Sequence, residues 1–300
     1  MPIKLIAAPH TPFNARGDLC LDVVQQQADY FVTTGVSGVF VGGSTGEGHS
    51  LLVEERMQLA DRWAVVGKQT GLSVIVQVGH NSQRESMRLA AHAANVGVDA
   101  ISSMAPCYYK PANADELVGF LQPIAAAAAA TPFYYYDIPS MTGVTLASVE
   151  LLRRSKQLPT LAGIKFTNQD LMQFQECVQF DSGRYEIWFG CDEALLAGYA
   201  LGARGAVGST YNFAAPLYHQ MIAAWEAGDQ DRARSLQAQS VRLIRSCQKY
   251  GYMAAAKSIM AMLGIDCGPV RPPLANLSSS QRDELRQTIA IMDALPLKPS

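Results

Sequence analysis

The sequence lacks both an excess of charge and any long apolar run. Its 300 residues carry 24 Lys and Arg against 26 Asp and Glu, which gives a formal net charge of -2. Without a basic surface, binding to nucleic acid or to an anionic membrane is not expected. The apolar run at the N-terminus is too short for a signal peptide, and no later segment approaches the length of a membrane span. These absences predict a cytoplasmic protein whose partner is a small molecule.

Several chemical motifs are absent as well. The six cysteines include no Cys-x-x-Cys pair, which indicates reduced thiols, and the five histidines show no spacing typical of zinc sites. No Gly-x-Ser-x-Gly segment marks a nucleophilic serine. The glycine-rich turns of P-loops and of dinucleotide-binding sheets are missing too. The chain is therefore expected to use no metal and no cofactor.

Short β-rich runs alternate with longer helical runs from residue 3 to about residue 226. The expected strands are residues 3–8, 38–42, 73–78, 100–104, 133–137, 161–167, 186–190 and 205–209. Eight successive β/α units with short links predict an α/β fold of the closed (β/α)₈ type, the TIM barrel, rather than an open sheet. The alanine-rich tract at residues 125–130 is expected to be helical, because alanine has the highest helix propensity.

Helical patterns continue after the eighth unit. An amphipathic segment begins at residue 228, a second helix is expected near residues 253–263, and a third begins at Ser278, which forms a capping-box pattern with Gln281. We therefore expect a barrel domain in residues 1–227 and an extension of about three helices in residues 228–300.

A lysine stands near the end of the sixth expected strand, in the run Leu-Ala-Gly-Ile-Lys-Phe-Thr. Strand alternation places Lys165 on the same face as Gly163 and Thr167. Leu161 is expected on that face as well. Burial disfavours the charged form of an amine, and a neutral amine attacks carbonyl carbons, so Lys165 is a candidate Schiff-base lysine. The alternative is a strand-end lysine whose ammonium group reaches water.

The ends of the other strands carry polar groups that an active site needs, since strand ends form the active site of this fold. The glycine-rich loop after the second strand carries Ser44 and Thr45, whose backbone and hydroxyl groups can bind an anion of carboxylate size. The alternative is a plain turn into the next helix. On the fifth strand, Tyr134 and Tyr136 share a face, and the one nearer the strand end can exchange protons with Lys165 unless it serves only as core.

The seventh strand ends in Gly190-Cys191-Asp192-Glu193, and the eighth ends in a small polar segment that includes Ser209. The two carboxylates either interact with the positive end of a helix dipole or accept hydrogen bonds from the hydroxyls of a sugar-like ligand.

Four segments together resemble the family of class I aldolases that contains N-acetylneuraminate lyase and dihydrodipicolinate synthase. They are Gly-Gly-Ser-Thr-Gly-Glu at 42–47, Tyr-Asp-Ile-Pro at 136–139, Gly-Ile-Lys at 163–165 and Gly-Ala-Val-Gly-Ser-Thr-Tyr-Asn at 205–212. The resemblance covers the whole chain. Residues 132–136, 140–144 and 189–193 resemble the lyase branch. The synthase branch typically has Thr-Thr in the first loop and an arginine at the position of Met141.

The resemblance implies that Lys165 forms the Schiff base, that Tyr136 shuttles protons, and that Ser44 and Thr45 bind the pyruvyl carboxylate. The residues implied to contact the rest of the sugar acid are Thr167, Gly190, Asp192, Glu193 and Ser209. Family members are usually tetramers, and Tyr108 matches a tyrosine that in some of them reaches a neighbouring subunit's site. Asp137 departs from the expected asparagine or histidine, and we expect this to affect packing rather than catalysis.

The activity that the resemblance implies is reversible aldol cleavage of N-acetylneuraminate to pyruvate and N-acetylmannosamine, without a cofactor. Two alternatives stay open. One is another pyruvate-dependent aldolase that acts on a different 2-keto sugar acid, and the other is a relative that keeps the pocket for ligand binding without turnover.

Overall fold

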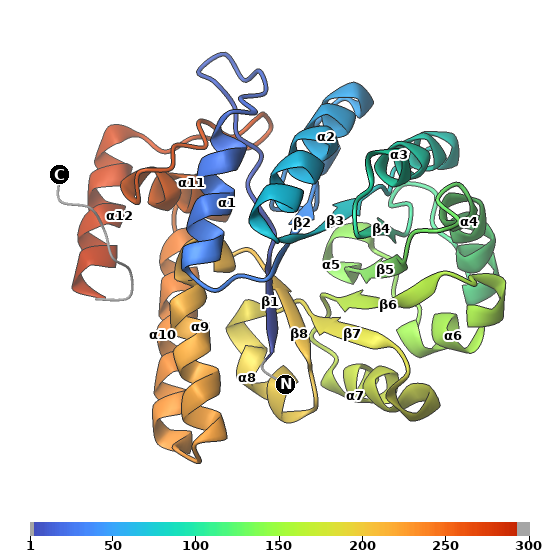
Figure 1. Ribbon diagram of the computed structural model, residues 1–300. Coiled ribbons are helices and arrows are strands. Elements are labelled where there is room, and N and C mark those ends of the chain that lie inside the picture. The colour runs from blue at the N-terminus through green and yellow to red at the C-terminus, as the bar shows by residue number, and fades with distance from the viewer. Residues whose placement is uncertain (1–2, 293–300) are drawn as a thin grey trace.

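The computed structural model describes residues 3–292, and its strands close into one parallel barrel in chain order (Figure 1). The strands are β1 Lys4–Ala7, β2 Gly38–Val41, β3 Ser73–Gln77, β4 Ala100–Met104, β5 Phe133–Asp137, β6 Leu161–Phe166, β7 Glu186–Phe189 and β8 Gly205–Gly208. The barrel closes because β1 pairs with β8 as well as with β2. The predicted TIM barrel is confirmed.

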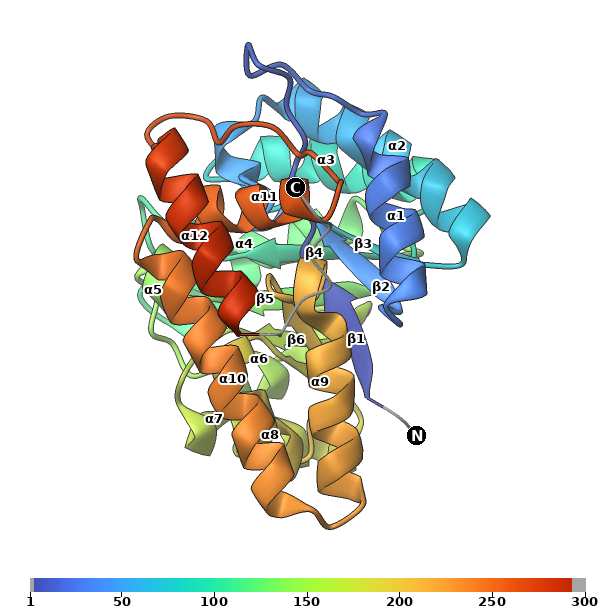
Figure 2. The same cartoon turned by 90° about the vertical axis from the view of Figure 1, so that its left-hand side faces the viewer.

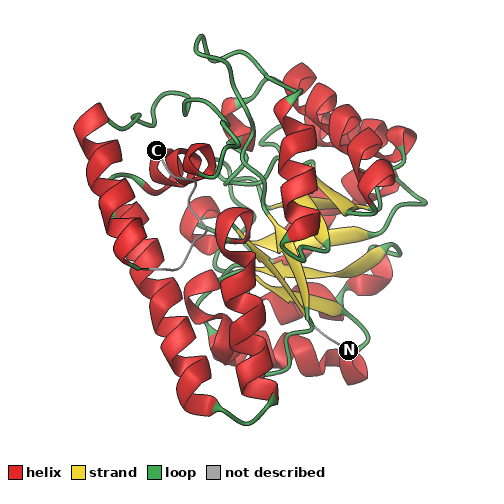
Figure 3. Cartoon of the chain, turned by 60° about the vertical axis from the view of Figure 1, so that its left-hand side comes forward, coloured by secondary structure: helices red, strands yellow, loops and turns green. Residues whose placement is uncertain are grey.

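Helices surround the barrel on its outer side, as Figure 3 shows. Within the described residues they are α1 Val23–Thr33, α2 Val53–Thr70, α3 Gln83–Val96, α4 Ala114–Ala126, α5 Pro139–Thr142, α6 Ser148–Arg153, α7 Leu171–Gln179, α8 Leu195–Ala200, α9 Tyr211–Glu226, α10 Gln230–Gln248, α11 Tyr252–Met262 and α12 Ser279–Ile291. None of these helices has the length and apolarity that crossing a membrane requires.

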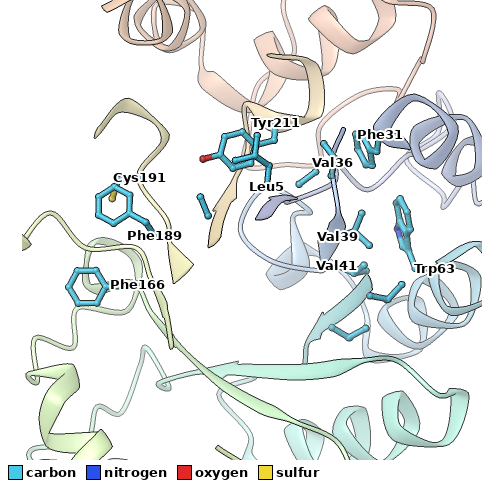
Figure 4. Packing of buried hydrophobic residues seen from close by; sticks show 14 of the residues in the cluster. Leu5, Phe31, Val36, Val39, Val41, Trp63, Phe166, Phe189, Cys191 and Tyr211 are labelled. Atoms are coloured by element: carbon cyan, nitrogen blue, oxygen red, sulfur yellow. The ribbon is translucent and has the colours of Figure 1, made fainter. Parts of the chain in front are cut away.

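Two apolar clusters result from the alternation of side chains along the strands. The larger cluster lies between strands and helices, where Phe31 of α1 stacks on Trp63 of α2 next to Val39 of β2 (Figure 4). The smaller cluster fills the barrel interior. Its buried members are Ile6, Ala8, Phe40, Ile75, Ala100, Met104, Tyr134, Tyr136, Ile138, Trp188 and Val207. The interior is thus a packed core that leaves space for a ligand only at a barrel end.

One expectation about the lysine strand is wrong, because β6 contains an irregularity. Leu161 belongs to the outer cluster and Ala162 packs against the inner one, the reverse of simple alternation. The pairing with β5 runs from Phe133 opposite Leu161 to Tyr134 opposite Gly163, so Ala162 is an extra residue. A bulge of this kind shifts the faces of the residues before it and leaves the later ones in place.

The alanine tract is the second correction. Helix α4 ends at Ala126, and residues 127–130 form turns rather than helix. The chain must reverse there to enter β5, and Pro132 disfavours helical backbone at the residue before it. Tertiary connection overrides the helix propensity of alanine at this point.

The C-terminal helices pack on the barrel. Figure 2 shows α9 and α10 side by side as an antiparallel pair, with α12 lying against α10. Leu243 and Cys247 of α10 are fully buried in the outer cluster that the barrel strands also join. The capping box predicted for Ser278 and Gln281 is present at the start of α12. Residues 293–300 of the expected extension lie outside the described residues.

Candidate active site

A cavity of about 600 Å³ opens at the C-terminal ends of the strands. Its lining includes nearly all of the residues proposed from the sequence: Ser44, Thr45, Tyr136, Lys165, Thr167, Gly190, Asp192, Glu193 and Ser209. Tyr108 is the exception, since it is 75% exposed and does not line this cavity. Residues that are far apart in the sequence therefore meet where the fold places an active site.

Lys165 is the central group of the cavity. It is 4% exposed, and its Nζ atom lies 3.8 Å from the centroid of the Tyr136 ring and 4.0 Å from that of Phe40. The pairing of β6 with β5 and β7 sets Lys165 opposite Tyr136 on one side and Trp188 on the other. The ion pairs formed within residues 3–292 do not include this amine. An amine that is removed from water and carries no carboxylate partner suits attack on a carbonyl carbon.

The two inward tyrosines of β5 have different environments. Tyr136 lines the cavity, and its hydroxyl lies 3.4 Å from the Ser44 hydroxyl. Tyr134 stacks on Trp188 and donates a hydrogen bond of 2.6 Å to Glu186 at the N-terminal end of β7. Of these two hydroxyls, that of Tyr136 is therefore the one placed for proton transfer at the lysine.

The loop after β2 folds tightly and presents Ser44 and Thr45 to the cavity. Glu47 adopts a left-handed backbone with φ 52°, and a Cβ atom on Gly48 would collide with the Gly42 carbonyl. The Thr11 hydroxyl donates a hydrogen bond of 2.5 Å to the Gly46 carbonyl. The glycines are thus needed for close backbone approach, and the two hydroxyl residues are the polar groups that the turn leaves toward the cavity.

The two carboxylates after β7 have different surroundings. Asp192 is 4% exposed, and its Oδ2 atom accepts hydrogen bonds from the backbone and hydroxyl of Thr210 at 2.8 and 2.6 Å. Burial raises the pKa of Asp192 to about 6, although the bonds from Thr210 oppose the shift. Its Oδ1 atom is buried and has no hydrogen-bond partner among residues 3–292. Glu193 is exposed on the cavity wall. Asp192 therefore uses one oxygen for the fold, while Glu193 can direct its carboxylate to a ligand.

Several lining residues were not expected from the sequence. Tyr252 of α11 lines the cavity, and its hydroxyl lies 2.7 Å from the Ser209 hydroxyl. Ile244 and Gln248 of α10 line the same side. No strand-end pattern marks them, because they stand on helices that follow the barrel. The amphipathic pattern of the segment that begins at residue 228 was the signal that this helix packs against the rest of the chain.

Asp137 and Cys191 stand near the lysine without the features of a reactive group. Asp137 is 1% exposed, lies outside the cavity lining, and accepts a hydrogen bond of 3.2 Å from Asn168, while burial raises its pKa to about 6. Cys191 lines the cavity, but burial raises the pKa of its thiol to about 12. The thiol therefore stays protonated and is a poor nucleophile.

The fold and the cavity together define a class of protein, a (β/α)₈ barrel whose strand ends surround a buried lysine. The chain belongs to the dihydrodipicolinate synthetase family, whose model matches residues 1–292.

Within this family the chain is similar to proteins named N-acetylneuraminate lyase. The relative from Homo sapiens is 42% identical over 97% of this chain and 92% of its own length, and the one from Sus scrofa is 40% identical over 97% and 93%. The structure of N-acetylneuraminate lyase from Proteus mirabilis superposes with a TM-score of 0.95 at 38% identity and covers 98% of this chain and 99% of that one.

Proposed function

We propose that the chain is a carbon–carbon lyase that cleaves N-acetylneuraminate reversibly to pyruvate and N-acetylmannosamine through a Schiff base on Lys165. The observation that carries the proposal is the buried amine of Lys165, 3.8 Å from the centroid of the Tyr136 ring, in a cavity lined by hydroxyl groups and carboxylates. The similarity to lyases at about 40% identity over most of the chain supports the choice of substrate.

Imine formation is the first step. The lone pair of the Lys165 amine attacks the ketone carbon of the open-chain sugar acid. The Tyr136 hydroxyl gives its proton to the departing oxygen, which leaves as water, and a protonated imine forms. Ser44 and Thr45 hold the neighbouring carboxylate, which fixes the ketone in front of the amine. Removing water from the cavity strengthens these polar contacts.

Bond cleavage is the second step. Tyr136, deprotonated in the first step, accepts with the help of the substrate carboxylate the proton of the hydroxyl on the carbon two positions from the imine carbon. The bond that joins this hydroxyl-bearing carbon to the carbon next to the imine breaks. The hydroxyl-bearing carbon becomes the aldehyde of N-acetylmannosamine, and the electron pair moves into the protonated imine to give an enamine. Protonation of the enamine carbon and hydrolysis of the imine release pyruvate and restore the amine. A protonated imine accepts the electron pair better than a ketone does, which is why the lysine is needed.

The remaining polar groups recognise the hydroxylated part of the substrate. Glu193 and Ser209 line the cavity, together with Thr167, Gly190 and Asp192. Carboxylate and hydroxyl acceptors suit vicinal hydroxyls, and acceptors left unpaired by a shorter keto acid would disfavour its binding.

Borohydride reduction in the presence of pyruvate tests the proposal. Reduction converts the imine into a stable secondary amine, so we expect one pyruvyl adduct, mapped by mass spectrometry to Lys165. Pyruvate release from N-acetylneuraminate should be measured on the same preparation. Absence of an adduct on Lys165 would overturn the Schiff-base mechanism. An adduct without cleavage of N-acetylneuraminate would favour a different 2-keto sugar acid or a ligand-binding relative.

The proposal extends to assembly and location. We propose a homotetramer in which Tyr108 reaches the active site of a neighbouring subunit. This is supported by the exposed pair Tyr108 and Tyr109, which are 75% and 86% exposed and lie in edge-to-face contact. A cytoplasmic location suits the six free thiols. Light scattering and the loss of kcat in Tyr108→Phe test the assembly.

A further inference from the structure

A second buried lysine lies near the loop after β2, residues 42–48, which carries Ser44 and Thr45 and is called the carboxylate-binding loop below. Lys257 of α11 forms an ion pair of 2.8 Å with Glu47, and the two side chains are 2% and 1% exposed. Among the ion pairs within residues 3–292, no other has both partners so deeply buried. The Lys257 amine also donates to the Pro269 carbonyl at 2.8 Å and lies 4.3 Å from the Phe13 ring centroid.

Glu47 connects this lysine to the cavity. It is two residues after Thr45 and three after Ser44, and its backbone has the left-handed conformation that completes the turn. One carboxylate oxygen pairs with Lys257, and the other accepts a hydrogen bond of 2.8 Å from the backbone of Arg271. A single side chain of the loop is therefore held by both α11 and the segment that follows it.

A second contact holds the C-terminal segment against the connection between β2 and α2. Arg271 forms two hydrogen bonds with Glu55 of α2, at 2.7 and 2.5 Å. Glu55 also accepts a hydrogen bond of 2.8 Å from the Leu52 backbone at the start of that helix. The C-terminal segment thus contacts the β2–α2 connection on both sides of the turn.

Stability alone is a weak reason for such a pair. Burying two charges costs several kcal/mol in general, and apolar replacements of similar volume are often as stable or more stable. A loop with glycines at positions 42, 43, 46 and 48 has high backbone freedom, so it needs outside contacts to present its hydroxyl groups in one geometry.

We propose that Lys257 is a positioning residue of the carboxylate-binding loop, which acts through Glu47 to hold Ser44 and Thr45 in their binding geometry. The inference rests on the proposed function, in which these hydroxyl residues bind the pyruvyl carboxylate. It gives the C-terminal helices, which lie outside the expected barrel domain of residues 1–227, an indirect part in substrate binding through this loop.

The experiment is a titration of pyruvate trapping at Lys165 by borohydride, with melting temperature measured on each variant. For Lys257→Met, the pyruvate concentration that gives half-maximal trapping should rise roughly tenfold to hundredfold, because a small displacement of binding groups has effects of this size. KM for N-acetylneuraminate should rise with it, and kcat should change less. Lys257→Arg keeps the charge and should recover part of the affinity. Lys249→Met, which breaks an exposed ion pair with Glu284 on the same extension, is the matched control and should leave trapping unchanged.

The double variant Glu47→Gln/Lys257→Met separates positioning from stability. It removes both buried charges, so it should fold even if the single variant does not, and its melting temperature should return toward that of the unaltered protein. Positioning predicts that pyruvate affinity stays weak in this variant, whereas a purely structural role predicts that affinity recovers with stability. The inference would be overturned if the double variant, or a folded Lys257→Met, reached half-maximal trapping at the same pyruvate concentration as the unaltered protein. Failure of the unaltered protein to trap pyruvate would instead count against the proposed function.

Discussion

The two buried lysines of this protein have nearly equal burial and opposite surroundings. Lys165 is 4% exposed and Lys257 is 3% exposed, and each amine lies over at least one aromatic ring. Lys257 faces the Glu47 carboxylate and the Pro269 carbonyl, whereas the amine of Lys165 faces aromatic rings and an open cavity. Burial alone therefore does not make an amine reactive.

The difference lies in compensation of charge. Burial lowers the pKa of Lys257, and Glu47 opposes this shift and favours the charged amine. A charged amine has no lone pair for attack on a carbonyl carbon, so Lys257 is suited to electrostatic positioning. The amine of Lys165 instead borders the open cavity. The presence or absence of a carboxylate partner separates a positioning lysine from a candidate nucleophile.

The largest expected effect is on Lys165 itself. Lys165→Ala should abolish cleavage of N-acetylneuraminate and pyruvate trapping, while the melting temperature stays near that of the unaltered protein, because the change removes a buried amine with no carboxylate partner. The measurement is turnover, trapping and thermal unfolding on one preparation. A pyruvyl adduct on Lys257 would break the comparison between the two lysines.

The next effect concerns the aromatic rings beside the two amines. Tyr136, beside Lys165, carries a hydroxyl, whereas Phe13, beside Lys257, does not. Tyr136→Phe should lower kcat roughly 10²- to 10⁴-fold through loss of acid–base help, with packing retained. Tyr134→Phe is the matched control, because its hydroxyl bonds Glu186 away from the cavity, and it should leave kcat unchanged. Near-normal kcat in Tyr136→Phe would assign proton transfer to another group.

A smaller effect is expected for an exposed carboxylate in the cavity, in contrast to the buried Glu47. Glu193→Ala should weaken the binding of N-acetylneuraminate by about 1 to 3 kcal/mol, which is measured as a higher KM, with a smaller change in kcat. Pyruvate trapping should not change, because pyruvate has no hydroxylated tail. Glu176→Ala, an exposed glutamate on α7 outside the cavity, is the control. Reduced melting temperature with unchanged KM would show that Glu193 only stabilises a helix end.

The smallest effect concerns a buried carboxyl group that, unlike Glu47, has no lysine partner. Burial raises the pKa of Asp137 to about 6, although the hydrogen bond from Asn168 opposes the shift. The folded state binds this proton more tightly than the unfolded state. The protonated Asp137 therefore stabilises the folded state fully below about pH 4, and this contribution is lost as pH rises through about 6. Asp137→Asn should therefore match the unaltered protein near pH 4 and exceed its stability by on the order of 1 kcal/mol at pH 7. Parallel melting curves across this pH range would contradict the shifted pKa.

Much of the fold and the centre of the cavity followed from the sequence alone. Strand runs and their alternation predicted the barrel, and strand-end positions singled out Lys165, Tyr136 and the Ser44–Thr45 pair, because such signals are local. The bulge at Ala162 was not predictable, since it depends on the register between β5 and β6.

Only the tertiary structure decided which of the polar groups are partners. Residues 47 and 257 are more than two hundred positions apart in the sequence, and nothing in the apolar spacing of α11 marks Lys257 as buried beside Glu47. The same holds for Tyr252 and Ser209, and for the division of labour between Asp192 and Glu193. Periodicity determines which face of an element is buried, whereas the packing of separate elements determines whether a buried charge has a partner, and here that packing distinguishes the two lysines.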